Sequence, residues 1–247
     1  MPETVQLMVT CLVDTFFPEI GEDMVRVLER LGVVVEFPPG QTCCGQPAFN
    51  AGLRSQARPL AEHTIRTFES LPGEVIIPSG SCAAMLRHGY LELFSEDAPW
   101  LERARSLAAR TYEFSEYLVD HLGVADIGAR WQGRLTYHAS CHLLRGLGVD
   151  RQPRLLLSHV HEAEVLELPH ADECCGFGGV FSLEHPEISA EMLKRKIGNL
   201  ESTKSPTLVV CDTGCLMHIQ GGLKRQKKPQ RVVHLAQVLA GRPAHGY

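Results

Sequence analysis

Aromatic residues and long apolar runs are scarce in this sequence. Phe, Trp and Tyr make up 6% of the 247 residues, and no nicotinamide or flavin motif is visible. The run "GFGG" at 176–179 follows a cysteine pair and lacks the G-x-G-x-x-G spacing of a dinucleotide site. No apolar run approaches the roughly 20 residues of a membrane span, and the N-terminus lacks the features of a signal peptide. We therefore expect a cytoplasmic protein without a membrane span.

Positive charge is not in excess either. Lys and Arg number 24 against 29 Asp and Glu, which gives a net charge of −5. The one basic cluster, "KRQKK" at 224–228, is interpreted as a solvated loop, so nucleic acid is not expected as a partner. No cluster of arginines marks a pocket for a carboxylate substrate. Hydrophobic residues reach 44%, which is typical of a globular protein with a packed core.

Cysteine-x-x-cysteine knuckles are also missing, although the sequence has nine cysteines. A reducing compartment disfavours disulfides, so these cysteines need another explanation. In the first copy of the pattern, 31 residues separate a single cysteine from an adjacent pair, and 37 residues separate the pair from a further cysteine. In the second copy the same intervals contain 32 and 39 residues. The matched cysteines are 130 to 133 positions apart, which indicates an internal repeat. They are Cys11, Cys43, Cys44 and Cys82, and then Cys141, Cys174, Cys175 and Cys215.

The segments around the cysteines repeat as well. "FPPGQTCCG" matches "LPHADECCG", and "EFSEYLVDHLG" at 113–123 matches "VVHLAQVLAG" at 232–241. We predict two homologous halves, residues 1–125 and 130–247, separated by a polar, glycine-containing boundary. The first half carries an extra stretch near 95–110, which we expect to form an added helix.

Hydrophobic patterns predict alternating strands and helices. Strands are expected at 5–9, 33–37 and 74–78, and again at 135–139, 164–168 and 207–210. Between them lie helical patterns such as Ile20, Met24 and Leu28. The alternation predicts an α/β fold with two pseudo-symmetric βαβαβα halves and parallel sheets. Each cysteine of the repeat follows a predicted strand, so these cysteines should meet at the C-terminal strand ends, where open α/β sheets bind ligands.

Four thiolates in one place suit zinc or an iron–sulfur cluster. Structural zinc usually takes C-x2–4-C knuckles, and neither half has a clean C-x-x-C. Adjacent cysteines tend to point apart, which is awkward for one tetrahedral ion and easier for a cluster with several irons. We therefore favour an iron–sulfur centre. A zinc site, a thiol or vicinal-disulfide redox site, and buried cysteines that act as small hydrophobes stay open as alternatives.

The repeated cysteine pattern resembles the cysteine-rich CCG domain found in heterodisulfide reductase and in the glycolate oxidase iron–sulfur subunit. "VTCLVDTFFPEIG", "IPSGSCAAMLR", "ECCGFGGVFS" and "GCLMHIQGGLKR" are similar to the lactate utilization protein A family, and the resemblance covers nearly the whole chain. It implies a cytoplasmic iron–sulfur electron-transfer subunit that acts with lactate utilization proteins B and C to oxidise L-lactate to pyruvate. The broader CCG fold implies an alternative, a subunit of heterodisulfide-reductase type that handles thiols or disulfides.

The same resemblance implies one cluster per half, of the 4Fe–4S type. By matching position, its ligands would be Cys11, Cys43, Cys44 and Cys82 in one half and Cys141, Cys174, Cys175 and Cys215 in the other. The fuller CCG pattern ends in C-x-x-C, and this sequence has Ser79 and Asp212 at the first position of that motif. No donor or acceptor site for a two-electron substrate is visible, so no residue is assigned as catalytic. We expect no oxidation of lactate by the chain alone.

Four further residues near the motifs receive weaker interpretations. Cys211 is out of register with the repeat, and we interpret it as the buried end of the strand "TLVVC" rather than as a ligand. Asp212 is interpreted as a solvated or helix-capping residue, with an oxygen ligand as the alternative. His142 and His218 lie near ligand cysteines in the sequence. We interpret both as structural histidines, with a hydrogen bond to sulfur or a proton-carrying role as the alternative.

Overall fold

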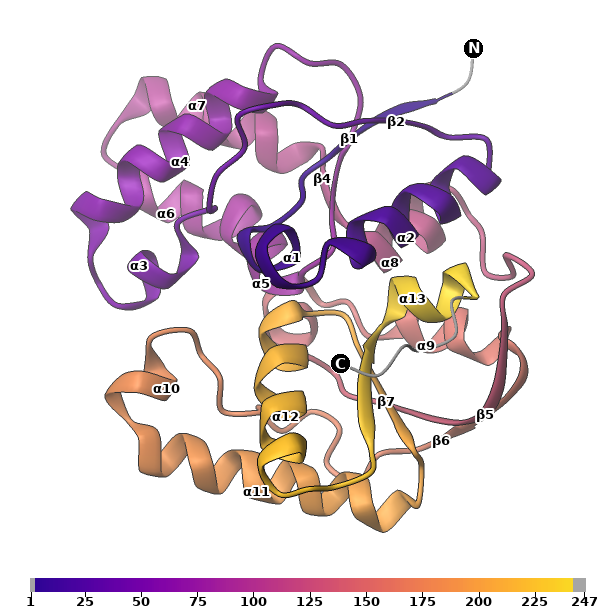
Figure 1. Cartoon of the computed structure of the whole chain (residues 1–247). Helices are drawn as coiled ribbons and strands as arrows, with labels where there is room; N and C mark the ends of the chain where they lie inside the picture. Colours follow the sequence, from indigo (N-terminus) through magenta and orange to yellow (C-terminus); the bar gives the residue numbers. More distant parts are fainter. Residues whose placement is uncertain (1–2, 242–247) are drawn as a thin grey trace.

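The structure is a computed structural model that describes residues 3–241, so positions 1–2 and 242–247 of the two expected halves lie outside the described residues. The strands form two four-stranded sheets, and every neighbouring pair of strands is parallel. The sheet orders are β2-β1-β3-β4 and β6-β5-β7-β8 (Figure 1). The strands are β1 (Thr4–Leu7), β2 (Val34–Glu36), β3 (Val75–Ile77), β4 (Thr111–Glu113), β5 (Arg130–Tyr137), β6 (His161–Leu166), β7 (Thr207–Val210) and β8 (Arg231–His234). The same order in both sheets confirms the α/β fold with two pseudo-symmetric halves.

Each sheet has a fourth strand that the hydrophobic patterns did not predict. The six expected strands are present, and β4 and β8 are added at one edge of each sheet. Both are short, "TYE" and "RVVH", and each runs directly into a helix. Because no turn residue separates either strand from its helix, the sequence pattern shows no boundary between the two elements.

Helices connect the strands in both halves. The first half contains α1 (Cys11–Phe16), α2 (Pro18–Arg30), α3 (Gln46–Asn50), α4 (Arg54–Phe68), α5 (Gly80–Ala84), α6 (Tyr90–Leu93), α7 (Ala98–Ala109) and α8 (Phe114–Glu116). The second half contains α9 (Arg151–Ser158), α10 (Phe181–Glu184), α11 (Pro186–Thr203), α12 (Thr213–Arg225) and α13 (Leu235–Ala240). Short π-helical turns occur at Met85–Gly89, Tyr117–His121 and His142–Gly146. The added helix expected near 95–110 is α7, where the ring of Trp100 stacks on Phe94 with centroids 5.5 Å apart.

The last helix of each half packs against the other half. α13 lies beside α2 (Figure 1), and α9 packs against α8 and the π-helical turn that follows it. The Arg30 guanidinium donates to the carbonyl oxygens of Leu239 and Ala240 at 3.4 and 3.3 Å. His234 Nε2 donates to Pro78 O at 2.8 Å. One hydrophobic core also runs through both halves, so the two sheets hold a fixed position relative to each other.

Within residues 3–241, no helix combines the length and the apolar character that crossing a membrane requires.

Candidate metal centre

Parallel strand order brings the cysteines of each half to one edge of its sheet. Cys11 is the first residue of α1, after β1, and Cys82 lies in α5, after β3. These two strands are neighbours, with β2 and β4 outside them, so the chain changes direction across the sheet between them. Ligands of open α/β sheets bind at such a switch point. The pair Cys43–Cys44 follows β2 in the adjacent loop. The second half repeats this arrangement after β5, β6 and β7, which confirms the expected place of the cysteines at the C-terminal strand ends.

The first cysteine set consists of Cys11, Cys43, Cys44 and Cys82. Within it, the two adjacent cysteines contact each other, and each also contacts a different third cysteine. Cys44 Sγ lies 3.4 Å from Cys82 Sγ, whereas the side chain of Cys43 shares a hydrogen bond with that of Cys11. The neighbours in sequence therefore direct their sulfur atoms toward different cysteines, which allows each sulfur to form a bond of its own to a shared centre.

The second cysteine set consists of Cys141, Cys174, Cys175 and Cys215, and it repeats this pairing. The Sγ atoms of Cys175 and Cys215 are 3.4 Å apart, and those of Cys174 and Cys141 are 3.9 Å apart. Gly176 follows the pair with a φ of 92°, a conformation that side chains disfavour. Its backbone N–H points at Cys174 Sγ from 3.4 Å. The Cys-Cys-Gly triplet thus forms a tight turn that presents two sulfurs and a donor to the same place.

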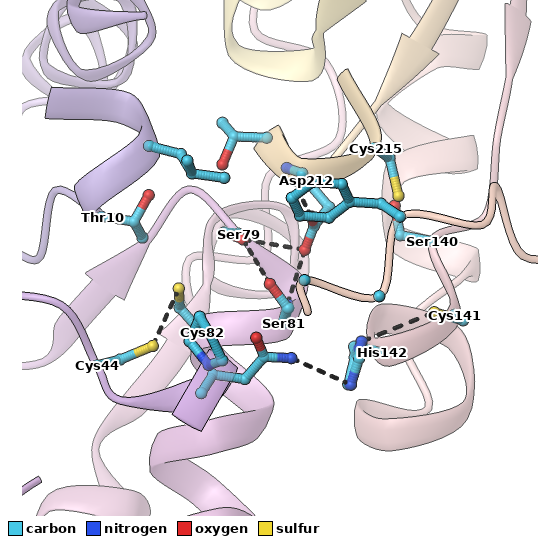
Figure 2. A pocket seen from close by; sticks show the side chains of 18 of the residues that line it. Thr10, Cys44, Ser79, Ser81, Cys82, Ser140, Cys141, His142, Asp212 and Cys215 are labelled. Atoms are coloured by element: carbon cyan, nitrogen blue, oxygen red, sulfur yellow. Dashed lines mark hydrogen bonds between the residues drawn. The ribbon is translucent and has the colours of Figure 1, made fainter. Parts of the chain in front are cut away.

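All eight cysteines line one cavity of about 130 Å³ between the two halves. Cys44, Cys82, Cys141 and Cys215 are labelled in Figure 2. Cys44, Cys82, Cys175 and Cys215 are buried, and the other four are half-buried. The walls between the sulfurs carry small polar residues, namely Thr10, Ser79, Ser81, Ser140, Asp212 and Thr213. The repeat therefore produces two cysteine sets that share one space rather than two separate pockets.

Hydrogen bonds between the thiols of each set shift the pKa values of these cysteines. A hydrogen bond from Cys11 lowers the pKa of Cys43 to about 3, and a hydrogen bond from Cys141 lowers the pKa of Cys174 to about 2. The pKa values of the two donating thiols are raised correspondingly. A bound metal replaces such protons, because it binds the sulfurs as thiolates. Clustered thiolates select soft centres such as zinc or iron–sulfur, and the separate contacts of the adjacent cysteines favour a centre with more than one metal ion. The residues present fit an iron–sulfur centre.

Asp212 joins the two halves at the cavity. Its Oδ2 accepts hydrogen bonds from Ser79 Oγ at 2.9 Å and from Ser81 N at 2.8 Å, both in the first half (Figure 2). Its Oδ1 accepts from Gly214 N at 3.0 Å and so caps α12. The capping role expected from the sequence is confirmed. Ser79 and Asp212, which stand where the fuller CCG pattern has cysteines, bond to each other across the pseudo-symmetric interface.

Replacement of this carboxylate should loosen the interface. Asp212→Ala removes three accepted hydrogen bonds and leaves a buried backbone donor at Gly214 and a half-buried one at Ser81 without an acceptor, so we expect the free energy of unfolding to fall by about 2–4 kcal/mol. Asp212→Asn keeps one acceptor oxygen, so its free energy of unfolding should fall by about half as much. Ser79→Ala should lower the free energy of unfolding by about 1 kcal/mol. Anaerobic urea unfolding measures all three. A loss below about 0.5 kcal/mol in Asp212→Ala, the level of an ordinary surface change, would contradict the bridge.

The two histidines singled out in the sequence occupy different places. His142 is in the cavity wall, with Nδ1 3.7 Å from Cys141 Sγ and Nε2 3.5 Å from Gln46 Nε2 of the first half. His218 is not part of that wall, and its Nε2 lies 3.4 Å from Ser189 Oγ. His142 therefore contacts a cysteine of the second set directly, whereas His218 interacts with Cys174 only through its charge.

Two further residues near the second set have contrasting positions. Cys211 is completely buried in the core and does not line the cavity, and its carbonyl oxygen accepts a hydrogen bond from Gly80 N at 3.2 Å. His138 was absent from the sequence candidates. It is completely buried, and a ring nitrogen lies within 4.8 Å of the sulfurs of Cys175 and Cys215. Its only sequence signal is its place three residues before Cys141.

Comparisons with known proteins agree with the repeated architecture. The cysteine-rich domain family CCG matches twice, at residues 5–87 and 135–220. Among solved structures, the aspartate racemase of Picrophilus torridus aligns with 96% of this chain and 91% of its own at 8% identity and a TM-score of 0.40, a level from which no functional comparison follows.

Curated relatives match along almost the whole chain. Lactate utilization protein A of Geobacillus sp. (strain WCH70) is 48% identical over 238 residues, which cover 96% of this chain and 99% of the relative. The protein of the same name from Anoxybacillus flavithermus is 48% identical over 95% of this chain and 98% of its own. Lactate utilization protein A 2 of Bacillus cereus (strain AH820) is 44% identical over 96% of this chain and 97% of its own. This chain, with its two CCG domains, belongs to the lactate utilization protein A family.

Proposed function

We propose that the chain is a cytoplasmic iron–sulfur electron-transfer subunit of a multi-subunit complex that oxidises L-lactate to pyruvate. The observation that carries this function is the convergence of eight cysteines, four from each half, on one cavity. The substrate follows from the relatives, which are named lactate utilization proteins and match at 44–48% identity. The first and second cysteine sets would each hold one centre, of the 4Fe–4S type.

The chemistry requires one-electron steps. Oxidation of lactate to pyruvate releases two electrons and two protons, and an iron–sulfur centre supplies one-electron redox chemistry when bound. The chain itself provides the thiolate ligands, and it buries two of them in each set, which limits contact with water. Because both sets line one cavity, electrons have a short path between the halves.

Partner subunits complete the reaction. The sequence has no nicotinamide or flavin motif that would take two electrons from lactate in one step. We therefore assign that step, and the final electron acceptor, to partners such as lactate utilization proteins B and C. The isolated chain should carry electrons and not oxidise lactate.

Anaerobic purification and a reconstitution assay test this function. The chain alone should be brown and contain about eight iron and eight sulfide, the content of two 4Fe–4S centres. Lactate-dependent dye reduction should stay at background with the chain alone and rise when the partners are added. Cys211→Ser should support the same activity in the complex, whereas Cys44→Ser combined with Cys175→Ser should abolish it. Protein without iron and sulfide would refute the cofactor, and lactate oxidation by the isolated chain would refute the need for partners.

Thiol–disulfide chemistry is the second candidate, because the same cavity contains half-buried thiolates. The pKa of Cys43 is about 3, and Cys44 Sγ lies 3.4 Å from Cys82 Sγ. A colourless protein without metal that exchanges thiols with a disulfide substrate would favour this role. A colourless protein with stoichiometric zinc would instead indicate a zinc-stabilised module.

A further inference from the structure

His138 is a completely buried histidine with one ring nitrogen left without a hydrogen bond to nitrogen or oxygen. It follows β5 directly and has no solvent exposure. Its Nδ1 lies 3.1 Å from Ala171 O, which can only accept, so Nδ1 carries a proton and donates. Among the nitrogen and oxygen atoms of the described residues, Nε2 has no hydrogen-bond partner. A buried imidazole in this state holds a lone pair on Nε2.

The second cysteine set lies next to the His138 ring. A ring nitrogen of His138, Cys175 Sγ and Cys215 Sγ all lie within 4.8 Å of one another. Ligands of a tetrahedral metal ion are about 3.5 Å apart at the usual metal–nitrogen and metal–sulfur distances. The three atoms are therefore close enough to bind the same metal centre after a small movement. Metal-binding histidines commonly donate their other N–H to a backbone carbonyl, which is the role of Ala171 O here.

We infer that His138 Nε2 is a metal ligand of the second centre, a fifth protein ligand beside the four cysteines of the second set. This inference rests on the proposed function, since it concerns the metal that the second cysteine set binds. Apart from Ala171 O, the partner of the His138 side chain is the Cys215 side chain, which is itself an expected ligand of the second centre. Histidine ligation of iron beside cysteine ligation is established chemistry in Rieske-type centres.

The first cysteine set has no equivalent ligand. The residue three positions before Cys11 is Met8, which is buried in the hydrophobic core of the first half. The two centres are therefore chemically different: the first has only sulfur ligands from cysteine, and the second adds a nitrogen. His138→Met is the matched change, because it gives the second half the residue that already occupies this position in the first.

Pulsed EPR of the full chain tests the nitrogen ligand. Protein labelled with ¹⁵N-histidine is purified anaerobically and reduced, and its spectrum is compared with that of unlabelled protein. We expect a nitrogen coupling that changes with the label in the wild type and in His142→Gln, and that is lost in His138→Met. A loaded wild-type protein without this coupling, or a coupling that persists in His138→Met, overturns the inference and leaves the proposed function intact.

A second measurement separates this result from failure of the proposed cofactor. If the wild type contains no iron or sulfide, the proposed function fails, and Co²⁺ titration of the metal-free chain tests His138 by itself. The affinity of the second cysteine set for Co²⁺ should then fall at least about tenfold in His138→Met and stay unchanged in His218→Gln. Equal affinity in the wild type and in His138→Met overturns the histidine ligand.

Discussion

Serine in place of Cys174 or Cys175 is expected to remove the metal of the second centre and to leave the first centre loaded. Serine in place of Cys43 or Cys44 should do the reverse. Serine keeps the size of the side chain but is a poor ligand for a soft metal, so the loss reports ligation rather than packing. Each variant should retain about half of the wild-type iron and acid-labile sulfide, measured per mole of chain after anaerobic purification.

Cys211→Ser is the matched control for these variants. This cysteine is buried in the core and lies outside the cavity wall, so the variant should keep full iron content. Wild-type iron in both Cys174→Ser and Cys175→Ser would refute the ligand assignment. Because the two sets share one cavity, loss of all iron in any single variant would show that the eight cysteines hold one common centre instead of two.

A second large effect is expected from a buried acid at the interface between the halves. Glu113 ends β4 and has no solvent exposure. Its Oε2 accepts from Ser115 N at 2.8 Å, from the Ser115 hydroxyl and from Glu116 N at 3.3 Å. Burial raises the pKa of Glu113 from 4.5 to about 8, and the hydrogen bonds offset only part of that effect. The native carboxyl group is therefore protonated over a pH range in which the unfolded chain is ionised.

This difference in proton binding predicts a loss of stability as the pH rises. Between pH 4.5 and about 8 the native state binds a proton at Glu113 that the unfolded state has released, so the free energy of unfolding falls through this window. The contribution amounts to roughly 4–5 kcal/mol. Glu113→Gln keeps an oxygen that can accept the cap hydrogen bonds and cannot ionise. It should match the wild type at pH 4.5 and be more stable at pH 9 by about 3–5 kcal/mol.

Urea unfolding at a series of pH values measures this effect in both proteins. Other titrating groups are the same in each, so the difference between the two curves isolates Glu113. Glu187→Gln, an exposed acid in the first turn of α11, is the control and should follow the wild-type curve. Parallel curves for the wild type and Glu113→Gln would contradict the buried, protonated state.

The sequence predicted the elements that depend on regular spacing. The matched cysteines indicated the repeat, and the alternation of apolar runs predicted six strands that the structure contains. β4 and β8 were not predicted, because each continues directly into a helix with no turn residue between them. The division of the chain into residues 1–125 and 130–247 stays a prediction, and so do the ligand roles of the cysteines. The packing of α13, from the second half, against α2, from the first half, had no signal in the local sequence pattern.

For the cysteine site, too, some features follow from the sequence and others only from the tertiary structure. The sequence by itself determined which cysteines gather in each half, because strand ends in a parallel sheet meet at one edge regardless of what lies beyond it. Only the tertiary structure decided that both sets face one cavity, that Asp212 bonds to Ser79, and that a ring nitrogen of His138 lies beside Cys175. These features depend on how the halves dock or on contacts between residues far apart in the chain. Such contacts are set by packing in three dimensions, and hydrophobic periodicity, which reports only on neighbours along one strand or helix, does not encode them.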